Sequence, residues 1–233
     1  MKHTFSAFVV LIVLLNSVCS ANFQLKRPQC TRQQLVYGIC INPDMEGAVQ
    51  ATQGPQIQDT FNRVVASAKA YLSTITPSKN KVVITDLDET LINNTQFYAR
   101  YKTFDPKHWD EWVSANKNGP YNQSVYELLQ YAKSRGFSVM FITGRTPEIA
   151  QDTLEQLHDL EWQGVFFRCG GRQTLSSRRF KAQVHEMLKA LGYQEVLNIG
   201  DQASDLVGPV DISHAGEQAK GQFLLPNVLY TIP

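Results

Sequence analysis

The feature that most constrains the fold of this chain is a series of short apolar runs, each followed by a stretch with helical spacing. In the first run, Val82, Val83 and Ile84 are consecutive and β-branched, which is typical of a strand buried on both faces. The runs that we expect to be strands cover residues 81–85, 137–142, 165–167, 195–199 and 223–225. Strands that alternate with helices predict an α/β fold with a parallel sheet and helices on both faces. The functional site of such a sheet lies outside the carboxyl ends of its strands.

Helical spacing and capping residues mark the segments between these strands. The segments that we expect to be helices cover residues 55–75, 125–132 and 180–191. Gly136 and Gly192 follow the last two and are typical of helix ends. Thr146 and Pro147 open a further helix, because threonine is favoured as an N-cap and proline at the first helical position.

A single domain with an insertion is the organisation that the chain length favours. The chain has 233 residues, 43% of them hydrophobic, and can bury one sizeable core. Residues 92–123 are irregular and rich in aromatic side chains, so we interpret them as a small cap inserted after the first strand. We therefore expect an N-terminal extension at residues 21–54 and the main domain at residues 55–233.

The first twenty residues have the pattern of a secretory signal peptide. Lys2 and His3 precede a short apolar run, and small residues follow it. Val18 and Ser20 would stand three and one residues before a cut after Ser20. We expect a secreted or periplasmic protein without stable membrane insertion; the sequence leaves open whether Cys19 carries a lipid.

Export makes disulfide bonds available to the remaining cysteines. Cys30 and Cys40 lie close together in the sequence, so we expect them to form a bridge. Cys169 is then left over, and we expect a buried thiol at a strand end.

The charge pattern argues against large anionic partners. The 22 basic residues nearly balance the 21 acidic ones and are scattered along the chain. A nucleic-acid polymer or a membrane surface would need clustered positive charge. Small-molecule chemistry remains open, and the sequence does not determine the oligomeric state, a homodimer included.

Asp86 and Asp88 are the sharpest chemical signal. Two carboxylates just past a buried strand repel each other and lose hydration. A bound divalent cation removes that cost, and carboxylate oxygens suit Mg²⁺. A carboxylate is also a competent covalent nucleophile. The alternative is a loop with solvated acidic residues.

Four motifs in order resemble those of the haloacid dehalogenase (HAD) superfamily. "VVITDLDETL" (82–91) resembles its first motif, and Thr143 in "FITGR" (141–145) its second. Lys181 stands where the family places its third-motif lysine, and "GDQASD" (200–205) is similar to the fourth motif. The resemblance covers nearly the whole mature chain and implies a HAD-like Rossmannoid fold.

Further segments resemble the acid phosphatase group of that superfamily. "DLDETLINN", "FDPKHWDEW" (104–112) and "GDQASDLVG" are similar to bacterial outer-membrane lipoprotein acid phosphatases and to plant vegetative storage proteins. "LLPNVLY" (224–230) is similar to the C-terminal segment of the bacterial members. The resemblance implies hydrolysis of small phosphomonoesters.

The resemblance also implies roles for the motif carboxylates. Asp86 would attack phosphorus and become an aspartyl phosphate, while Asp88 would act as general acid and then as general base. Mg²⁺ would be bound by Asp86, by the backbone carbonyl of Asp88 and by Asp201, with support from Asp205.

Phosphate and substrate contacts follow from the same resemblance. Thr143 and the Gly144 amide would bind the transferring oxygens, and Lys181 would neutralise their charge. Phe104 and Tyr230 would stack on the flat part of a substrate such as a nucleoside monophosphate.

Each supporting residue has a simpler interpretation that the sequence leaves open. Lys181 could be an exposed helix lysine, Thr143 a helix cap and Asp205 a turn cap. We expect His185 on an exposed helix face. The aromatic residues of the insertion more often pack against one another than recognise a ligand.

Two rival functions use the same fold. One is a storage or binding protein with a vestigial site, against which the presence of Asp86 argues. The other is a different reaction of the same nucleophile, either dehalogenation or phosphoryl transfer to an alcohol. Asp88 and the Asp201–Asp205 pair argue against dehalogenation, which needs neither a metal nor a second acid.

Overall fold

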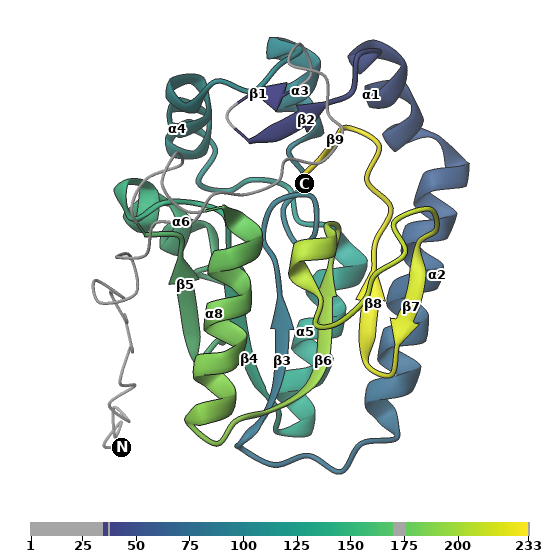
Figure 1. Ribbon diagram of the computed structural model, residues 1–233, viewed down its shortest axis with the longest axis vertical. Helices are drawn as coiled ribbons and strands as arrows, with labels where there is room; N and C mark the ends of the chain where they lie inside the picture. Colours follow the sequence, from purple (N-terminus) through teal and green to yellow (C-terminus); the bar gives the residue numbers. More distant parts are fainter. Residues whose placement is uncertain (1–34, 37, 170–175, 233) are drawn as a thin grey trace, which may run out of the picture.

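The computed structural model describes residues 35, 36, 38–169 and 176–232, and its centre is a six-stranded sheet (Figure 1). The strands run in the order β5-β4-β3-β6-β8-β7. They are β3 (Lys81–Thr85), β4 (Ser138–Thr143), β5 (Gly164–Phe167), β6 (Gln194–Gly200), β7 (Gly216–Ala219) and β8 (Gln222–Leu224). All adjacent pairs are parallel except β7–β8, which is antiparallel. The predicted α/β class with a mainly parallel sheet is confirmed, whereas the apolar runs gave no sign of the half-exposed strand β7.

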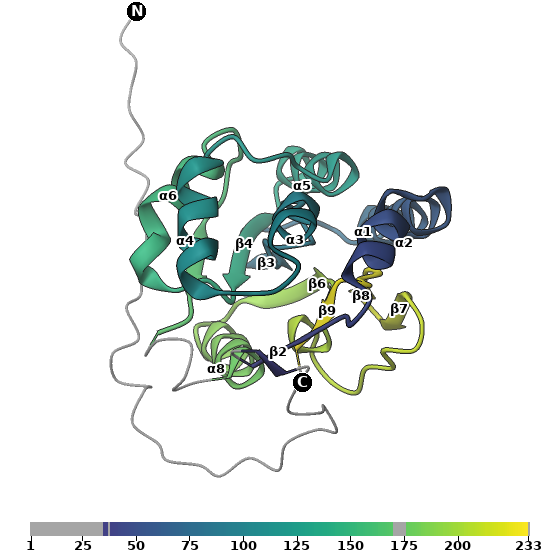
Figure 2. The ribbon, with the colours of Figure 1, turned by 90° about the horizontal axis from the view of Figure 1, so that it is seen from above.

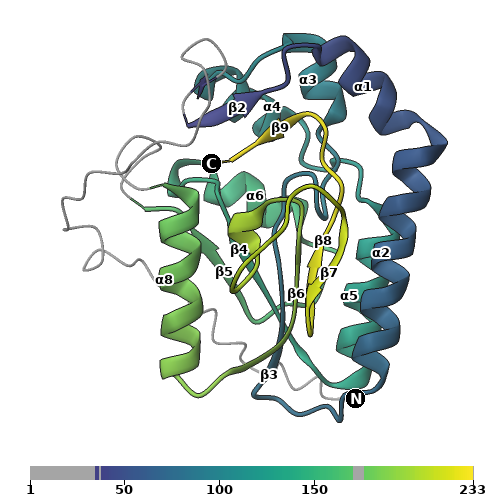
Figure 3. The same ribbon diagram turned by 45° about the vertical axis from the view of Figure 1, so that its right-hand side comes forward.

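Helices cover both faces of this sheet, as the alternation predicts (Figure 3). α2 (Pro55–Ser73) and α5 (Gln123–Arg135) bury apolar residues in the same core cluster as Val83, Val139 and Leu197. α8 (Ser177–Ala190) packs on the opposite face against the alternate side chains, among them Val82 and Ile84. The two faces differ because successive side chains of a strand point to opposite sides.

The remaining elements gather beyond the carboxyl ends of the strands (Figures 1 and 2). Residues 92–123 contain α3 (Thr95–Tyr101) and α4 (Pro106–Ala115), and η1 (Pro147–Ile149) and α6 (Ala150–Gln156) follow β4. The Asp105 carboxylate caps α4 by accepting from the Lys107 and His108 amides, and proline is the first residue of this helix.

The two ends of the described chain meet beyond the carboxyl ends of the strands as well. β1 (Leu35–Val36), β2 (Ile39–Ile41) and β9 (Tyr230–Thr231) form a small antiparallel sheet, and α1 (Met45–Gln53) follows it. Side chains from α1, α3, α4 and the segment around β9 share one apolar cluster, here named the cap cluster. Its members include Met45, Phe97, Tyr98, Phe104, Trp109, Val113, Leu229 and Tyr230. These members of the cap cluster therefore come from three separate parts of the sequence.

The cysteines correct one expectation. Cys169 and Cys40 are both disulfide-bonded, so the prediction of a free buried thiol at Cys169 is wrong. Spacing along the chain could not show this, because disulfide pairing depends on distances in the folded protein. Cys30, the expected partner of Cys40, and the expected signal peptide lie outside the described residues. Among the described helices, none is both long and apolar enough to cross a bilayer.

Candidate active site

Three neighbouring strands deliver the site residues at one edge of the sheet. Asp86 follows β3, Thr143 ends β4, and Asp201 follows β6. β3 lies between β4 and β6, so the three strand ends are adjacent in space. η2 (Ala203–Asp205), directly after β6, adds Asp205. The parallel order of strands thus brings together residues that are far apart in the sequence.

Asp86, Asp201 and Asp205 form a buried carboxylate triad. One oxygen from each lies within 4.8 Å of the other two. Gly200 makes room for the triad, because a Cβ at this position would lie 2.2 Å from Asp205 Oδ2. Converging carboxylate oxygens are the donors that a hard divalent cation takes, so the triad fits a metal of the Mg²⁺ type.

Amide and hydroxyl donors orient the Asp201 carboxylate within the triad. Thr90 Oγ1 donates to Asp201 Oδ1 at 3.0 Å, while Gln202 Nε2 and Asn227 Nδ2 donate to Oδ2 at 2.6 and 2.7 Å. Burial, with the neighbouring Asp205 carboxylate, raises the pKa of Asp201 to about 7. Burial likewise raises the pKa of Asp86, against the opposing effect of Lys181. Without a metal, this cluster therefore resists full ionisation.

Lys181 is the cation that faces two of the triad carboxylates. Its Nζ lies 2.7 Å from Asp86 Oδ1 and 2.6 Å from Asp205 Oδ1. Burial lowers the pKa of Lys181, but the Asp205 and Asp86 carboxylates outweigh burial and leave that pKa above its usual value. The side chain is 3% exposed, which excludes the interpretation of Lys181 as an ordinary surface lysine.

Asp88 is not part of the triad and is paired with a different cation. Arg145 contacts it through Nη2 at 2.7 Å from Oδ1 and through Nε at 3.1 Å from Oδ2. The Arg145 side chain is fully buried, and its Nη1 donates to Thr153 and Gln156 in α6. The guanidinium also lies 5.8 Å from the centre of the Trp109 ring. Asp86 and Asp88, two residues apart, therefore have separate electrostatic partners.

Thr143, the last residue of β4, and Gly144, which follows it, are closely surrounded by other residues. Thr143 is fully buried, and its Oγ1 accepts a hydrogen bond from the Arg145 amide at 3.1 Å. A Cβ on Gly144 would approach Ser177 Oγ, in the first turn of α8, to 3.2 Å. The turn after β4 is thus packed closely against the start of the helix that carries Lys181.

The loop after β3 curls back on itself at Glu89. This residue has a left-handed φ of 58°, which is uncommon outside glycine. Its Oε1 accepts from the Asn94 amide at 3.0 Å, and its Oε2 accepts from Tyr230 Oη at 2.7 Å. Burial and the neighbouring Asp88 carboxylate raise the pKa of Glu89 well above its usual value. The strained turn therefore ties α3 and the C-terminal strand to the loop that carries Asp86 and Asp88.

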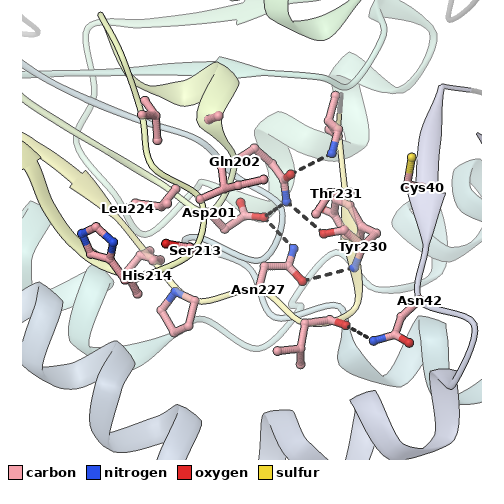
Figure 4. Close-up of a pocket in the computed structure, with 18 of the residues that line it drawn as sticks. Cys40, Asn42, Asp201, Gln202, Ser213, His214, Leu224, Asn227, Tyr230 and Thr231 are labelled. Atoms are coloured by element: carbon pink, nitrogen blue, oxygen red, sulfur yellow. Dashed lines mark hydrogen bonds between the residues drawn. The ribbon is translucent and has the colours of Figure 1, made fainter. Parts of the chain in front are cut away.

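Phe104 and Tyr230 are both buried in the cap cluster. The centre of the Phe104 ring lies 5.7 Å from that of Trp109, and the Tyr230 ring lies 5.4 Å from the Tyr98 ring. Tyr230 also lines a pocket of about 810 Å³, together with Asp201, Gln202 and Asn227 (Figure 4). Their stacking on a substrate stays a prediction.

Sequence reasoning missed several residues of this site and misplaced one. Arg145 stands two residues after Thr143 inside "FITGR", and that position was the signal that could have identified it. Asn94 and Asn227 lie inside the segments "DLDETLINN" and "LLPNVLY", but nothing in either segment distinguished the asparagine from its neighbours. His185, which we expected on an exposed face, is buried with its Nδ1 2.9 Å from Glu195 Oε2. The error arose because α8 buries one side against β6, where Glu195 provides a polar partner.

Comparisons with known proteins agree with this geometry. Residues 16–233 match the family model described as HAD superfamily, subfamily IIIB (acid phosphatase). The chain is 28% identical over 188 residues to acid phosphatase 1 of Solanum lycopersicum, covering 77% of this chain and 71% of the relative. It is 29% identical over 161 residues to vegetative storage protein 1 of Arabidopsis thaliana, covering 65% and 56%. The fold is similar to that of the class C acid phosphatase from Bacillus anthracis, with a TM-score of 0.66, 17% identity and coverage of 84% and 87%.

Proposed function

Since the chain belongs to subfamily IIIB of the HAD superfamily, the acid phosphatases, we propose that it hydrolyses phosphomonoesters through an aspartyl-phosphate intermediate on Asp86. The observation that carries the proposal is the separation of the two loop carboxylates. Asp86 lies against Lys181, within the triad, whereas Asp88 is held by Arg145. Two carboxylates in different surroundings can take different roles in acid–base and nucleophilic catalysis.

In the first step, a carboxylate oxygen of Asp86 attacks phosphorus in line with the ester oxygen. The bond between phosphorus and that oxygen breaks, and Asp88 donates a proton to the departing alcohol. In the second step, water attacks the phosphorus of the aspartyl phosphate while Asp88 takes up a proton from the water. The bond from phosphorus to Asp86 breaks, which releases inorganic phosphate and restores the Asp86 carboxylate and the protonated Asp88.

The neighbouring residues neutralise and orient the phosphoryl group in this proposal. Lys181 supplies positive charge beside Asp86, and Thr143 and the Gly144 amide donate to the phosphoryl oxygens. Mg²⁺, held by Asp86, Asp201, the backbone carbonyl of Asp88 and, in support, Asp205, would stabilise the negative charge of the phosphoryl group when bound. The support for the metal is the burial and convergence of the triad.

The substrate class and the location of the protein are finer parts of the proposal. We propose aromatic monophosphates, such as nucleoside monophosphates, as substrates that stack on Phe104 and Tyr230. What supports this is that both rings belong to the cap cluster, and that Tyr230 donates to Glu89 of the loop that carries Asp86 and Asp88. We propose that the protein acts after export, as a secreted or periplasmic enzyme.

The test is turnover of p-nitrophenyl phosphate by Asp86→Asn. We expect a loss of at least about 10³-fold, because the covalent route is closed. Asp59→Asn is the matched control: it makes the same chemical change at an exposed residue of α2 and should keep full activity. Chelation with EDTA should inactivate the wild type, and added Mg²⁺ should restore it. Wild-type activity in Asp86→Asn would exclude the mechanism, and an inactive wild type in Mg²⁺ would favour a storage or binding protein.

A further inference from the structure

Asn94 is the N-cap residue of α3, but its side chain does not cap the helix. An N-cap asparagine normally accepts a hydrogen bond from an amide of the first helical turn. Here the side-chain Nδ2 donates instead to Asp88 Oδ1 at 3.0 Å. The backbone of Asn94 is fixed as well, because its amide donates to Glu89 Oε1 at 3.0 Å. This buried amide is thus diverted from its local role towards the acid–base residue.

Trp112 of α4 determines which way round this amide lies. Its Nε1 lies 3.2 Å from Asn94 Oδ1. An indole N–H can donate but cannot accept, so it selects the oxygen of the asparagine amide. The NH₂ group must then face Asp88. With Trp112 lacking this donor, the amide could rotate by half a turn and present its oxygen to the Asp88 carboxylate.

The donors around Asp88 also distinguish its two oxygens. Within the described residues, Oδ1 accepts from both Asn94 and Arg145, whereas Oδ2 accepts from Arg145 alone. Both lone pairs of Oδ1 are then used as acceptors, whereas one lone pair of Oδ2 is left for a proton, so the oxygen that can carry and deliver a proton is Oδ2. Asn94 therefore aims the Asp88 carboxyl as well as holding it.

From this geometry we propose that Trp112 is a positioning residue for proton transfer, acting on Asp88 through Asn94. The bond from Trp112 Nε1 fixes the Asn94 amide, and the amide turns Oδ2 of Asp88 towards the ester oxygen that leaves. Trp112 touches neither phosphorus nor Asp86 in this arrangement. Its effect is specific to the protonation of the leaving group, and the proposal rests on the acid–base role of Asp88 proposed above.

The experiment compares leaving groups in Trp112→Phe. An alkyl phosphate such as β-glycerol phosphate needs a proton on its leaving oxygen, whereas p-nitrophenolate departs readily without one. We expect kcat/KM to fall roughly tenfold for β-glycerol phosphate and by less than about twofold for p-nitrophenyl phosphate. Phenylalanine keeps the ring beside Phe97, whose centre lies 6.0 Å from that of Trp112.

Val113→Ala is the matched control for a weakened cap. Val113 is fully buried on the same helix and belongs to the cap cluster, but it makes no side-chain hydrogen bond to Asn94. It should lower the melting temperature and affect both substrates alike. Asn94→Ala should reproduce the tenfold selective loss, and Trp112→Phe should add nothing to it in the double variant, because the two residues act in series.

Equal losses on the two substrates in Trp112→Phe, or losses that multiply in the double variant, would overturn the inference. If Trp112→Phe does not fold, Asn94→Ala alone decides: a loss without preference for the alkyl substrate overturns it. Failure of the proposed function is distinguishable, because the wild type would then hydrolyse neither substrate or Asp86→Asn would remain active.

Discussion

Replacing Lys181 by methionine should destabilise the metal-free protein strongly. The ammonium is buried between Asp86 and Asp205, at 2.7 and 2.6 Å. Removing one partner of a buried ion pair leaves an uncompensated charge and costs about 3–5 kcal/mol. For a domain of this size, 1 kcal/mol corresponds to about 2–4 °C in melting temperature. We therefore expect Lys181→Met to melt about 6–20 °C below the wild type in EDTA at pH 8.

Calorimetry or circular dichroism during heating measures this difference. Lys189→Met makes the same change at an exposed residue of α8 and should shift the melting temperature by no more than about 2 °C. Adding Mg²⁺ should recover part of the loss, since the metal replaces the missing positive charge. A second change, Asp205→Asn, should also recover part of it, because one of the two facing carboxylates is then neutral.

Two results would refute this reasoning. One is a melting temperature of Lys181→Met in EDTA that matches that of Lys189→Met. The other is a further loss of stability when Asp205→Asn is added to Lys181→Met. Either result would mean that the charge of Lys181 does not compensate the triad carboxylates in the folded protein.

Two further predictions concern pH and substrate stacking. A carboxyl whose pKa is higher in the folded than in the unfolded protein favours folding below its unfolded pKa and loses that contribution as the pH rises through its folded pKa. For Asp201 the folded pKa is about 7, so the metal-free protein should melt at a lower temperature at pH 8 than at pH 5.5. Mg²⁺ should raise the melting temperature more at pH 8 than at pH 5.5. Equal melting temperatures at the two pH values in EDTA would contradict this prediction. Phe104→Ala and Tyr230→Ala should raise KM for aromatic monophosphates roughly 5- to 150-fold and change little for aliphatic ones. Equal loss on both substrate classes, with a lower melting temperature, would show that the rings only pack the cap cluster.

The sequence predicted the sheet and the helices that cover it, because both depend on patterns along the chain. Val82, Val83 and Ile84 are apolar on both faces, and β3 is buried on both sides. The predicted insertion at residues 92–123 contains α3 and α4, but the segments of the chain that pack against it could not be predicted. β9 pairs with β2 across most of the chain, and such short strands leave hardly any periodic signal.

The same division applies to the candidate site. Asp86, Thr143, Lys181 and Asp201 could be predicted as site residues because each stands at a strand end or in a motif that local sequence can reveal. What only the tertiary structure decided is how these groups are partnered, as in the contact between Tyr230 and Glu89, 141 residues apart. Hydrogen bonds between distant residues depend on where the backbone brings them, and no local pattern of residue types encodes that distance. The orientation of the Asn94 amide by Trp112 is therefore a property of the folded cap, although both residues can be read from the sequence.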